Sequence, residues 1–164
     1  FNGIIWSGII NSRSGLKIGI TRKNQEVTRW MDQGAIEAIK IAEVPNRRIS
    51  GLIEVSLKKY VSDKTNWRKM LSMDPSPVNL LEKKKIYSEH INAEFQKYCL
   101  DDNYITEIRY PILKYPVSVK SLALRKHNTV EGKLVGVKGQ YLIFEDNRVF
   151  NVRAHDGYIV NCLF

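Results

Sequence analysis

The sequence predicts an α/β fold of the α+β kind, in which two unlike halves are joined by a helix. Residues 1–75 alternate β-type and amphipathic helical runs in the order β-β-α-β-α-α, which is typical of one α/β domain. Residues 76–104 contain one helical run and predict a helical connector. Residues 105–164 contain only short β-type runs separated by turn residues, so they predict a small all-β module.

The first domain is predicted to open with a β-hairpin. Residues 3–10 are rich in isoleucine, and residues 16–21 alternate apolar with other side chains. We therefore expect two antiparallel strands around a turn at residues 11–15, which are small and polar and end in glycine. A short helix over residues 27–33 should follow, with Gly34 as its stop signal.

The remaining elements follow from periodicity. Residues 35–44 fit a helix or a strand, and the closing proline favours a strand. Residues 49–61 carry one apolar stripe at helical spacing, and residues 66–71 add a further helical turn. After a break with two prolines, a helix is expected over residues 79–97. Six short β-type runs within residues 104–163 then suggest a small barrel or a curled sheet.

Composition and charge limit the possible functions. The chain has 164 residues with 26 Lys+Arg, 17 Asp+Glu and a formal charge of +9, and its 43% hydrophobic content excludes a disordered chain. Residues 1–75 hold 13 basic and 7 acidic side chains, and residues 105–164 hold 9 and 5. An excess of this size favours polyanionic partners, above all nucleic acid. The alternative is a solvated basic surface without any such role.

Several other classes find no support in the sequence. No apolar run approaches the ~20 residues of a membrane span, and no secretory signal is visible, so no membrane partner is expected. No P-loop and no GxSxG elbow is present, and no small-molecule cofactor is evident. Cys99 and Cys162 are too few for a four-thiolate zinc site, and we expect buried free thiols of a cytoplasmic protein. The three histidines are scattered without metal-ligand spacing.

Two parts of the chain resemble a known family. The runs KIGITR at 17–22, TRWMDQGA at 28–35 and TNWR at 65–68 resemble an uncharacterised bacterial domain-of-unknown-function family, numbered 2797. The run GKLVGVKGQYLIFEDNRVFNVRAHDGY at 132–158 is similar to the C-terminal part of the same family. Together these similarities cover most of the chain.

The first half also resembles the GIY-YIG nuclease superfamily, which has a β-hairpin, a helix with an arginine, a third strand and a helix with a glutamate. The run 17–21 resembles its second tripeptide motif. Arg29, ten residues after Gly19, falls at the position of its arginine, and Glu54 at that of its metal-binding glutamate. Asn66 resembles the asparagine of its last motif. The resemblance implies a GIY-YIG-like β-β-α-β-α domain over residues 1–75.

The resemblance further implies cleavage of phosphodiester bonds with Mg²⁺ or Mn²⁺. Glu54 would hold the metal, and Arg29 would stabilise the charge on the phosphate. The superfamily uses a tyrosine of its first tripeptide, whereas the first strand here contains no tyrosine. Lys17 is then the candidate base, provided that burial lowers its pKa.

Basic and polar side chains near these positions are predicted to contact nucleic acid. The set comprises Arg22, Lys23, Arg47, Arg48, Lys58, Asn66, Arg68 and Arg153. Arg153, His155 and Tyr158 are also predicted to form a surface cluster, whereas the lysines at 83–85 are interpreted as the solvated face of a helix.

The same residues have purely structural interpretations. Glu54 and Lys58 are spaced i,i+4, as in an ordinary surface ion pair. Asn66 is a good helix cap, and Trp30 and Trp67 fit the core. Three functions therefore stay open. The first is a metal-dependent nuclease of GIY-YIG type acting on DNA or RNA. The second is a catalytically inactive nucleic-acid-binding protein, on structured RNA or the ribosome. The third is a protein-interaction module.

Overall fold

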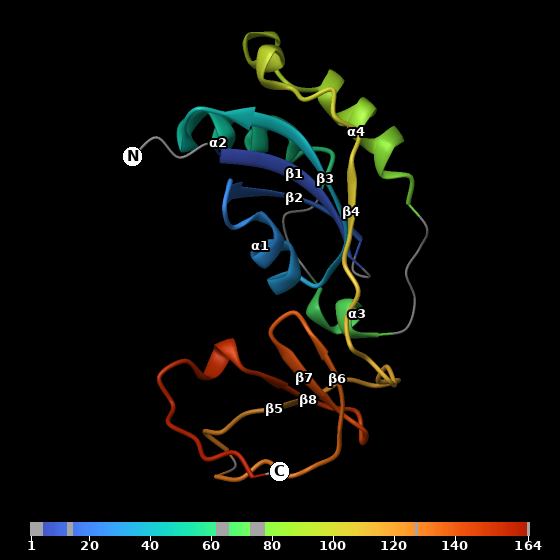
Figure 1. Ribbon diagram of the computed structural model, residues 1–164, viewed down its shortest axis with the longest axis vertical. Coiled ribbons are helices and arrows are strands. Elements are labelled where there is room, and N and C mark those ends of the chain that lie inside the picture. Colours follow the sequence, from blue (N-terminus) through green and yellow to red (C-terminus); the bar gives the residue numbers. More distant parts are fainter. Residues whose placement is uncertain (1–4, 13–14, 62–65, 73–77, 127, 164) are drawn as a thin grey trace.

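The computed structural model describes residues 5–12, 15–61, 66–72, 78–126 and 128–163, and it has the predicted mixed α+β architecture (Figure 1). In chain order, the elements are β1 (Ile5–Ser12), β2 (Gly15–Arg22), α1 (Glu26–Asp32), β3 (Ala35–Val44), α2 (Arg47–Leu57), α3 (Trp67–Leu71), α4 (Leu80–Glu89), the 3₁₀ helix η1 (Ala93–Tyr98), β4 (Ile105–Glu107), β5 (Lys120–Leu122), β6 (Leu134–Lys138), β7 (Tyr141–Phe144), β8 (Arg148–Asn151) and the 3₁₀ helix η2 (Arg153–His155). The strand interpretation of residues 35–44 is confirmed.

The first sheet has the strand order β2-β1-β3-β4, and all three pairings are antiparallel. The predicted hairpin is therefore confirmed as β1 and β2, although part of its expected turn, at residues 13–14, lies outside the described residues. A bulge interrupts the β1–β3 ladder, because Ser7 pairs with Ala42 while Gly8 pairs with Lys40. The skipped Ile41 and its neighbour Ala42 consequently both enter the same core cluster.

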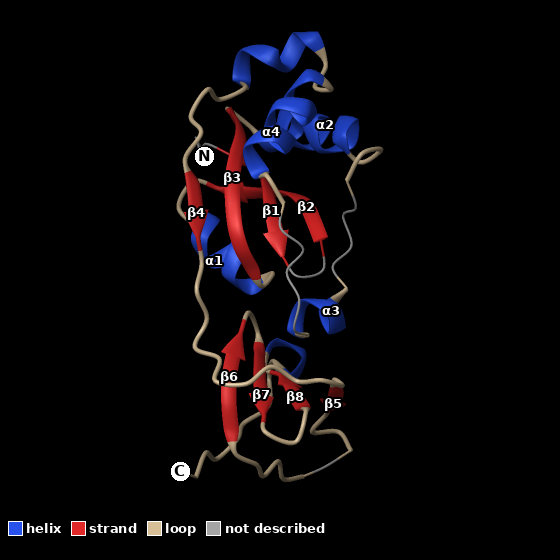
Figure 2. Ribbon diagram, turned by 90° about the vertical axis from the view of Figure 1, so that its right-hand side faces the viewer, coloured by secondary structure: helices blue, strands red, loops and turns tan. Residues whose placement is uncertain are grey.

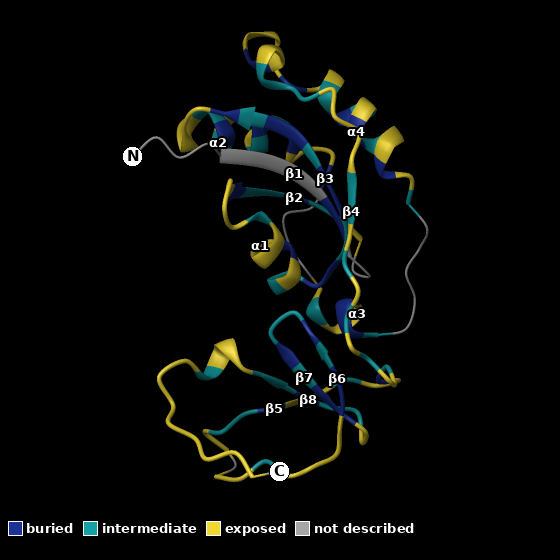
Figure 3. Cartoon of the chain, viewed as in Figure 1, coloured by how far each residue is buried: buried dark blue, intermediate teal, exposed yellow. Residues whose placement is uncertain are grey.

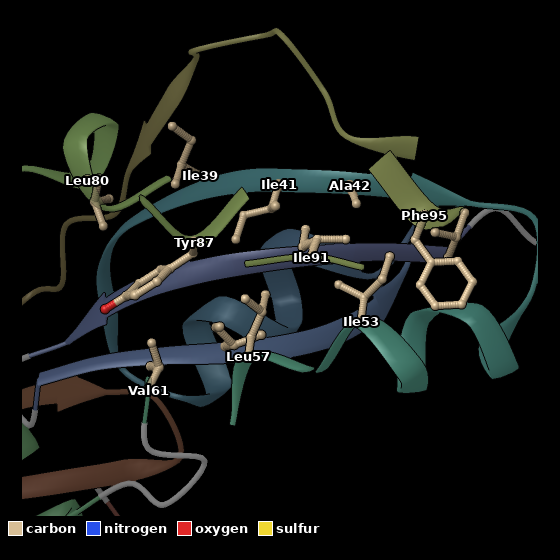
Figure 4. Close-up of a cluster of buried hydrophobic side chains, with 12 residues drawn as sticks. Ile39, Ile41, Ala42, Ile53, Leu57, Val61, Leu80, Tyr87, Ile91 and Phe95 are labelled. Atoms are coloured by element: carbon tan, nitrogen blue, oxygen red, sulfur yellow. The ribbon is translucent and has the colours of Figure 1, made fainter. Parts of the chain in front are cut away.

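Helices cover both faces of this sheet. On one face, α2 and α4 close the largest core cluster, in which Ile53 and Leu57 of α2 pack with Ile39 of β3 (Figure 4). On the other face, Trp30 of α1 packs with Ala38 of β3 in a separate cluster. Figure 2 shows α1 behind the sheet and α2 with α4 in front of it. The sheet thus lies between α1 and α2.

Three helices begin at an asparagine cap. The side-chain Oδ1 atoms of Asn46, Asn66 and Asn79 accept hydrogen bonds of 3.0, 3.2 and 3.2 Å from backbone N–H groups three residues further on. Each bond satisfies one of the donors that a helix leaves free in its first turn. The interpretation of Asn66 as a helix cap is therefore confirmed.

The second sheet has the order β5-β8-β7-β6, and its edges do not close into a barrel. The predicted barrel is wrong for two reasons. The first expected run contributes β4, which pairs with β3 of the first sheet. The last expected run, residues 158–163, forms no strand and is exposed, with Ile159 completely so. Four strands of three to five residues are left, which is too little to curl round on itself.

The helix predicted over residues 79–97 is two elements. The helix α4 ends at Glu89 with His90 as its C-cap, and η1 follows, so that Ile91 and Phe95 can both pack on the large core cluster. Two predictions of exposure and burial are also wrong. Lys84 is only 5% exposed and donates a hydrogen bond to the Asp102 carbonyl, whereas Cys162 is exposed. Both follow from tertiary packing that a local pattern does not contain.

Among the described residues, no helix has the length and apolar character needed to cross a membrane.

The two halves meet at a dense junction below α1. The single proton of the Tyr110 hydroxyl faces two carbonyl oxygens, those of Ala35 at 2.9 Å and Met31 at 3.2 Å, so it is shared in a three-centre hydrogen bond. The Lys138 ammonium, fully buried, donates to the Met70 carbonyl at 3.0 Å. The helix α3 belongs to this junction as well, because Met70 and its neighbour Leu71 complete the core of the second sheet.

Candidate nucleic-acid interface

Four of the predicted contact residues gather at one end of the first sheet. Because β1 is antiparallel to both β2 and β3, Ile5 pairs with Arg22 on one side and with Val44 on the other. The C-terminal ends of β2 and β3 therefore lie at the same end of the sheet. Arg22 is the last residue of β2 and Lys23 follows it, while Arg47 and Arg48 are the first residues of α2, just after β3. We call these four exposed residues the basic end.

Local structure fixes this arrangement. Asn46 caps α2, which places Arg47 and Arg48 in the first turn of the helix, where no acidic side chain stands. The helix dipole adds to the positive potential at that position. One carboxylate moderates it, since Lys23 Nζ lies 4.0 Å from Glu43 Oε1. No ion pair is formed by Arg22, Arg47 or Arg48 with any acidic residue in the described part of the chain.

The residues predicted for catalysis lie on two faces of the sheet. Lys17 is half-buried on β2 opposite Ile10, which belongs to the cluster beneath α1, and Arg29 is exposed on α1 itself. Glu54 is half-buried on α2, next to the core residue Ile53. Since α1 and α2 cover opposite faces, the sheet separates Glu54 from Arg29 and Lys17. These three side chains do not meet in one packed site.

The fit of a metal ion is correspondingly limited. Within the described residues, no three His, Cys, Asp or Glu side chains converge on a common point. Glu54 offers a single carboxylate, which can hold a Mg²⁺ ion that keeps most of its waters but does not build a protein cage. The described histidines are engaged otherwise. His90 stacks on Tyr60 with ring centroids 4.0 Å apart, and His155 forms hydrogen bonds through both ring nitrogens.

The other predicted contact residues lie elsewhere. Lys58 follows the C-terminal end of α2. Asn66 uses its side-chain oxygen as the α3 cap, and the Arg68 guanidinium lies 4.2 Å from the ring centre of Trp67. Arg153 Nη1 pairs with Asp32 Oδ2 at 3.0 Å across the junction. This ion pair offsets the positive charge of Arg153, one of the residues predicted to contact nucleic acid.

A cavity of about 390 Å³ lies beside the second sheet, and the sequence did not predict it as a site. Its wall combines the rings of Trp67, Tyr141, His155 and Tyr158 with Arg125. His155 was predicted to be exposed, yet it is half-buried. The only sequence signal was the expected cluster of Arg153, His155 and Tyr158. Trp67 and Tyr141 come from distant segments, and only the fold reveals that they face the same space.

The fold and the surface define a mixed α+β protein with a strongly basic end and an aromatic cavity. The model of the family described as "Protein of unknown function (DUF2797)" matches residues 9–160, which is nearly the whole chain. The chain therefore belongs to this family. No curated protein and no solved structure matches it.

Proposed function

We propose that this protein binds nucleic acid, DNA or RNA, through the basic end. The observation that carries the proposal is the convergence of four exposed cationic side chains from two segments of the chain at one edge of the sheet. Arginine is well suited to this role, because its planar guanidinium can donate two parallel hydrogen bonds to one phosphate. The formal charge of +9 would draw a polyanion towards the protein.

The proposal predicts a steep dependence of affinity on salt. Each phosphate contact releases condensed counterions, so the logarithm of the binding constant falls by about 0.7–0.9 per contact for each tenfold rise in salt. Binding of labelled single strands and duplexes of both DNA and RNA should be measured over a salt series. A protein-interaction module with an incidental basic surface would show neither tight binding nor this slope.

Matched double variants locate the contact. Replacing Arg47 and Arg48 by glutamine should weaken binding and reduce the salt slope by about 1.4–1.8, which corresponds to two phosphate contacts. The control replaces Lys83 and Lys85 on α4, which changes the net charge equally at a helix that is not part of the basic end (Figure 1). The control should bind with nearly the wild-type slope. Equal losses in the two variants would contradict a specific role for the basic end.

Metal-dependent cleavage is a second candidate function, favoured by the order β1-β2-α1-β3-α2, in which α1 carries Arg29 and α2 carries Glu54. In that case Glu54 would hold Mg²⁺ or Mn²⁺, and the ion would supply charge stabilisation at the phosphate. Arg29 would bind a phosphate oxygen, and Lys17 would be the base. The position of Glu54 on the opposite face of the sheet weighs against this candidate. Binding without cleavage is therefore the function that we place first.

We also propose a cytoplasmic location. Cys99 and Cys162 are both free thiols. Thiols persist in reducing compartments, whereas oxidising compartments favour disulfides. Fractionation of cells that produce the protein, with detection by an antibody, would test this; recovery from an oxidising compartment would contradict it.

A further inference from the structure

We propose that the aromatic cavity beside the second sheet is a binding site for one unpaired nucleotide, meaning a nucleobase with its phosphate. The site is separate from the basic end, so the inference goes beyond the proposed function and needs no contact there. Its size fits this ligand class. Small-molecule sites occupy about 300–1,000 Å³, and the cavity, at about 390 Å³, lies at the lower end of that range.

Flat aromatic side chains form the walls of the cavity. Trp67 and Tyr141 lie parallel, with an interplanar angle of 7° and ring centroids 5.6 Å apart. Tyr158 stands edge-on against His155, at 5.7 Å and 70°, and about half of its surface (53%) is exposed. Trp67 and Tyr141 stack on each other and form the rigid inner wall, so the exposed ring of Tyr158 is the one on which a nucleobase can stack. Such stacking does not depend on base identity.

The walls are held in place before any ligand arrives. The Leu124 backbone N–H donates to His155 Nε2 at 3.1 Å, so the proton of the neutral ring is on Nδ1, which donates to the Asn151 carbonyl at 2.7 Å. Phe150 stacks against the same ring with centroids 4.4 Å apart. Trp67 is fixed from the other side, because α3 is anchored in the core through Leu71. A preorganised wall reduces the entropy lost on binding.

The cavity also offers a polar group and a positive rim. Ser121 lines it and supplies a hydroxyl that can bond to the edge of a base, whereas the Asn151 side chain in the same wall already bonds to the Ala154 N–H and to Tyr141. Burial raises the pKa of the Tyr141 phenol, against the opposing effects of an Asn151 hydrogen bond and the Arg68 charge, so the hydroxyl keeps its proton at neutral pH. Arg125 is exposed at the rim, where it can reach a phosphate.

The charges around the cavity favour an anionic ligand. None of the described lining residues is acidic, and Arg125 forms no ion pair with a described acidic residue. Asp156 is exposed next to His155 in sequence, but it is not part of the wall. An aromatic face, an edge-bonding group and a cation in one small cavity together match the three parts of a nucleotide better than they match an apolar ligand.

The test is a titration of the full chain with the four ribonucleoside 5′-monophosphates and with single-stranded hexanucleotides, followed by calorimetry. Tyr158→Ala should weaken binding about 10-fold through loss of stacking. Arg125→Gln should weaken it about 10-fold and should abolish the advantage of a nucleotide over its nucleoside. Both residues are exposed, so both variants should fold, which circular dichroism and thermal melting would verify.

Matched controls make the result specific. Tyr104→Ala removes an aromatic ring that is 72% exposed outside the cavity, and Lys126→Gln removes a charge next to Arg125. Both controls should bind as the wild type does. Binding of hexanucleotides alone would identify the base of a strand as the ligand, and equal binding of mononucleotides would identify a free nucleotide. Either result supports the site, provided that Tyr158→Ala weakens the binding of that ligand.

Two results would overturn the inference. One is that neither mononucleotides nor hexanucleotides bind. The other is that they bind equally well to the wild type, Tyr158→Ala and Arg125→Gln. The proposed function is tested separately, because the Arg47→Gln, Arg48→Gln double variant should leave mononucleotide binding unchanged. Suppose that long strands bind in a salt-sensitive way and that Tyr158→Ala has no effect. This result would support the basic end as the binding surface and would reject the cavity as a nucleotide site.

Discussion

The two sheets of this protein are stabilised in different ways. The first sheet is covered by helices on both faces, and its strand β3 is buried or half-buried along its whole length, as Figure 3 shows. The second sheet has short strands, a smaller core cluster and long exposed connections. Its core includes Met70 and Leu71 of α3, which precede the sheet by many residues. Local periodicity thus specifies the first sheet, whereas the second depends on contacts made at the junction.

Two buried lysines sharpen this comparison and give the largest expected effect. Lys138 at the junction donates to the carbonyl of Met70, a residue that is only 2% exposed. Replacing Lys138 with Met would remove the hydrogen-bond donor of this carbonyl, and water could not take its place because the site is buried. We expect a loss of about 2–3 kcal/mol in the free energy of unfolding, measured by urea denaturation.

The matched variant is Lys84→Met in the first half. The carbonyl that accepts its hydrogen bond belongs to Asp102, which is exposed, so water can replace the ammonium. Burial also lowers the pKa of Lys84, against the raising effects of Asp102 and Asp101, which means that its charge is costly to bury. We expect a loss below about 1 kcal/mol. Equal losses for the two lysine variants would contradict the distinction between the two environments.

Two glycines with positive φ give the next effect. Gly139, at φ +57°, lies in the turn between β6 and β7, and a Cβ there would be 3.0 Å from the backbone oxygen of Asp32. Gly157, at φ +86°, has open space where its Cβ would be. Gly139→Ala should therefore destabilise the protein by about 1–3 kcal/mol, and Gly157→Ala by less, because it carries backbone strain alone. A smaller thermal shift for Gly139→Ala than for Gly157→Ala would refute the close approach at the junction.

Tyr110 allows a test by pH. Tyr110→Phe removes the hydrogen bond that this hydroxyl shares between two carbonyls across the junction, and it should cost about 1 kcal/mol at neutral pH. Burial, and then the charge of Asp32, raise the pKa of this phenol well above its ordinary value of 10. The unfolded chain therefore loses this proton first, and the stabilising contribution falls as the pH rises above about 10. The stability difference between wild type and variant should shrink from pH 8 to about pH 10.5; a constant difference would contradict a protonated, buried phenol.

The smallest effect is expected for Arg153→Gln. The Arg153–Asp32 pair is partly exposed, and such pairs contribute about 0.2–1 kcal/mol. Because Asp32 already neutralises this charge, the variant should change nucleic-acid affinity less than the loss of Arg47 alone. Filter binding of both single variants at low salt would show this. If Arg153→Gln lost as much affinity as Arg47→Gln, the nucleic acid would also contact the junction, which would contradict a binding surface confined to the basic end.

Much of the first half could be predicted from the sequence, because alternation and helical spacing are local signals. The strand Ala35–Val44 and the short helix before Gly34 are examples. The second half could not be predicted equally well. The sequence pattern of residues 104–113 indicates a strand but not the sheet that the strand joins. Only the fold shows that its strand β4 pairs with β3. The burial of Lys138 next to a turn glycine was likewise invisible, because its partner is about 70 positions away.

The candidate site divides in the same way. The basic character of residues 22–23 and 47–48 is readable from the sequence, and the strand register explains why they meet. The separation of Arg29 from Glu54 is a property of the two sheet faces, which the element order alone does not determine. The aromatic cavity draws on α3, β5, β7, β8 and η2 together, so no single run carries its signal.

The most direct test of binding without cleavage measures both in one sample. Labelled single- and double-stranded DNA and RNA should be incubated with the protein in Mg²⁺ or Mn²⁺, and the bound fraction and the products should be read on parallel gels. Glu54→Gln and Arg29→Ala are the companion variants. We predict intact substrate, salt-sensitive binding and no loss of affinity in Glu54→Gln. Metal-dependent products that disappear in both variants would contradict the account and establish the nuclease instead.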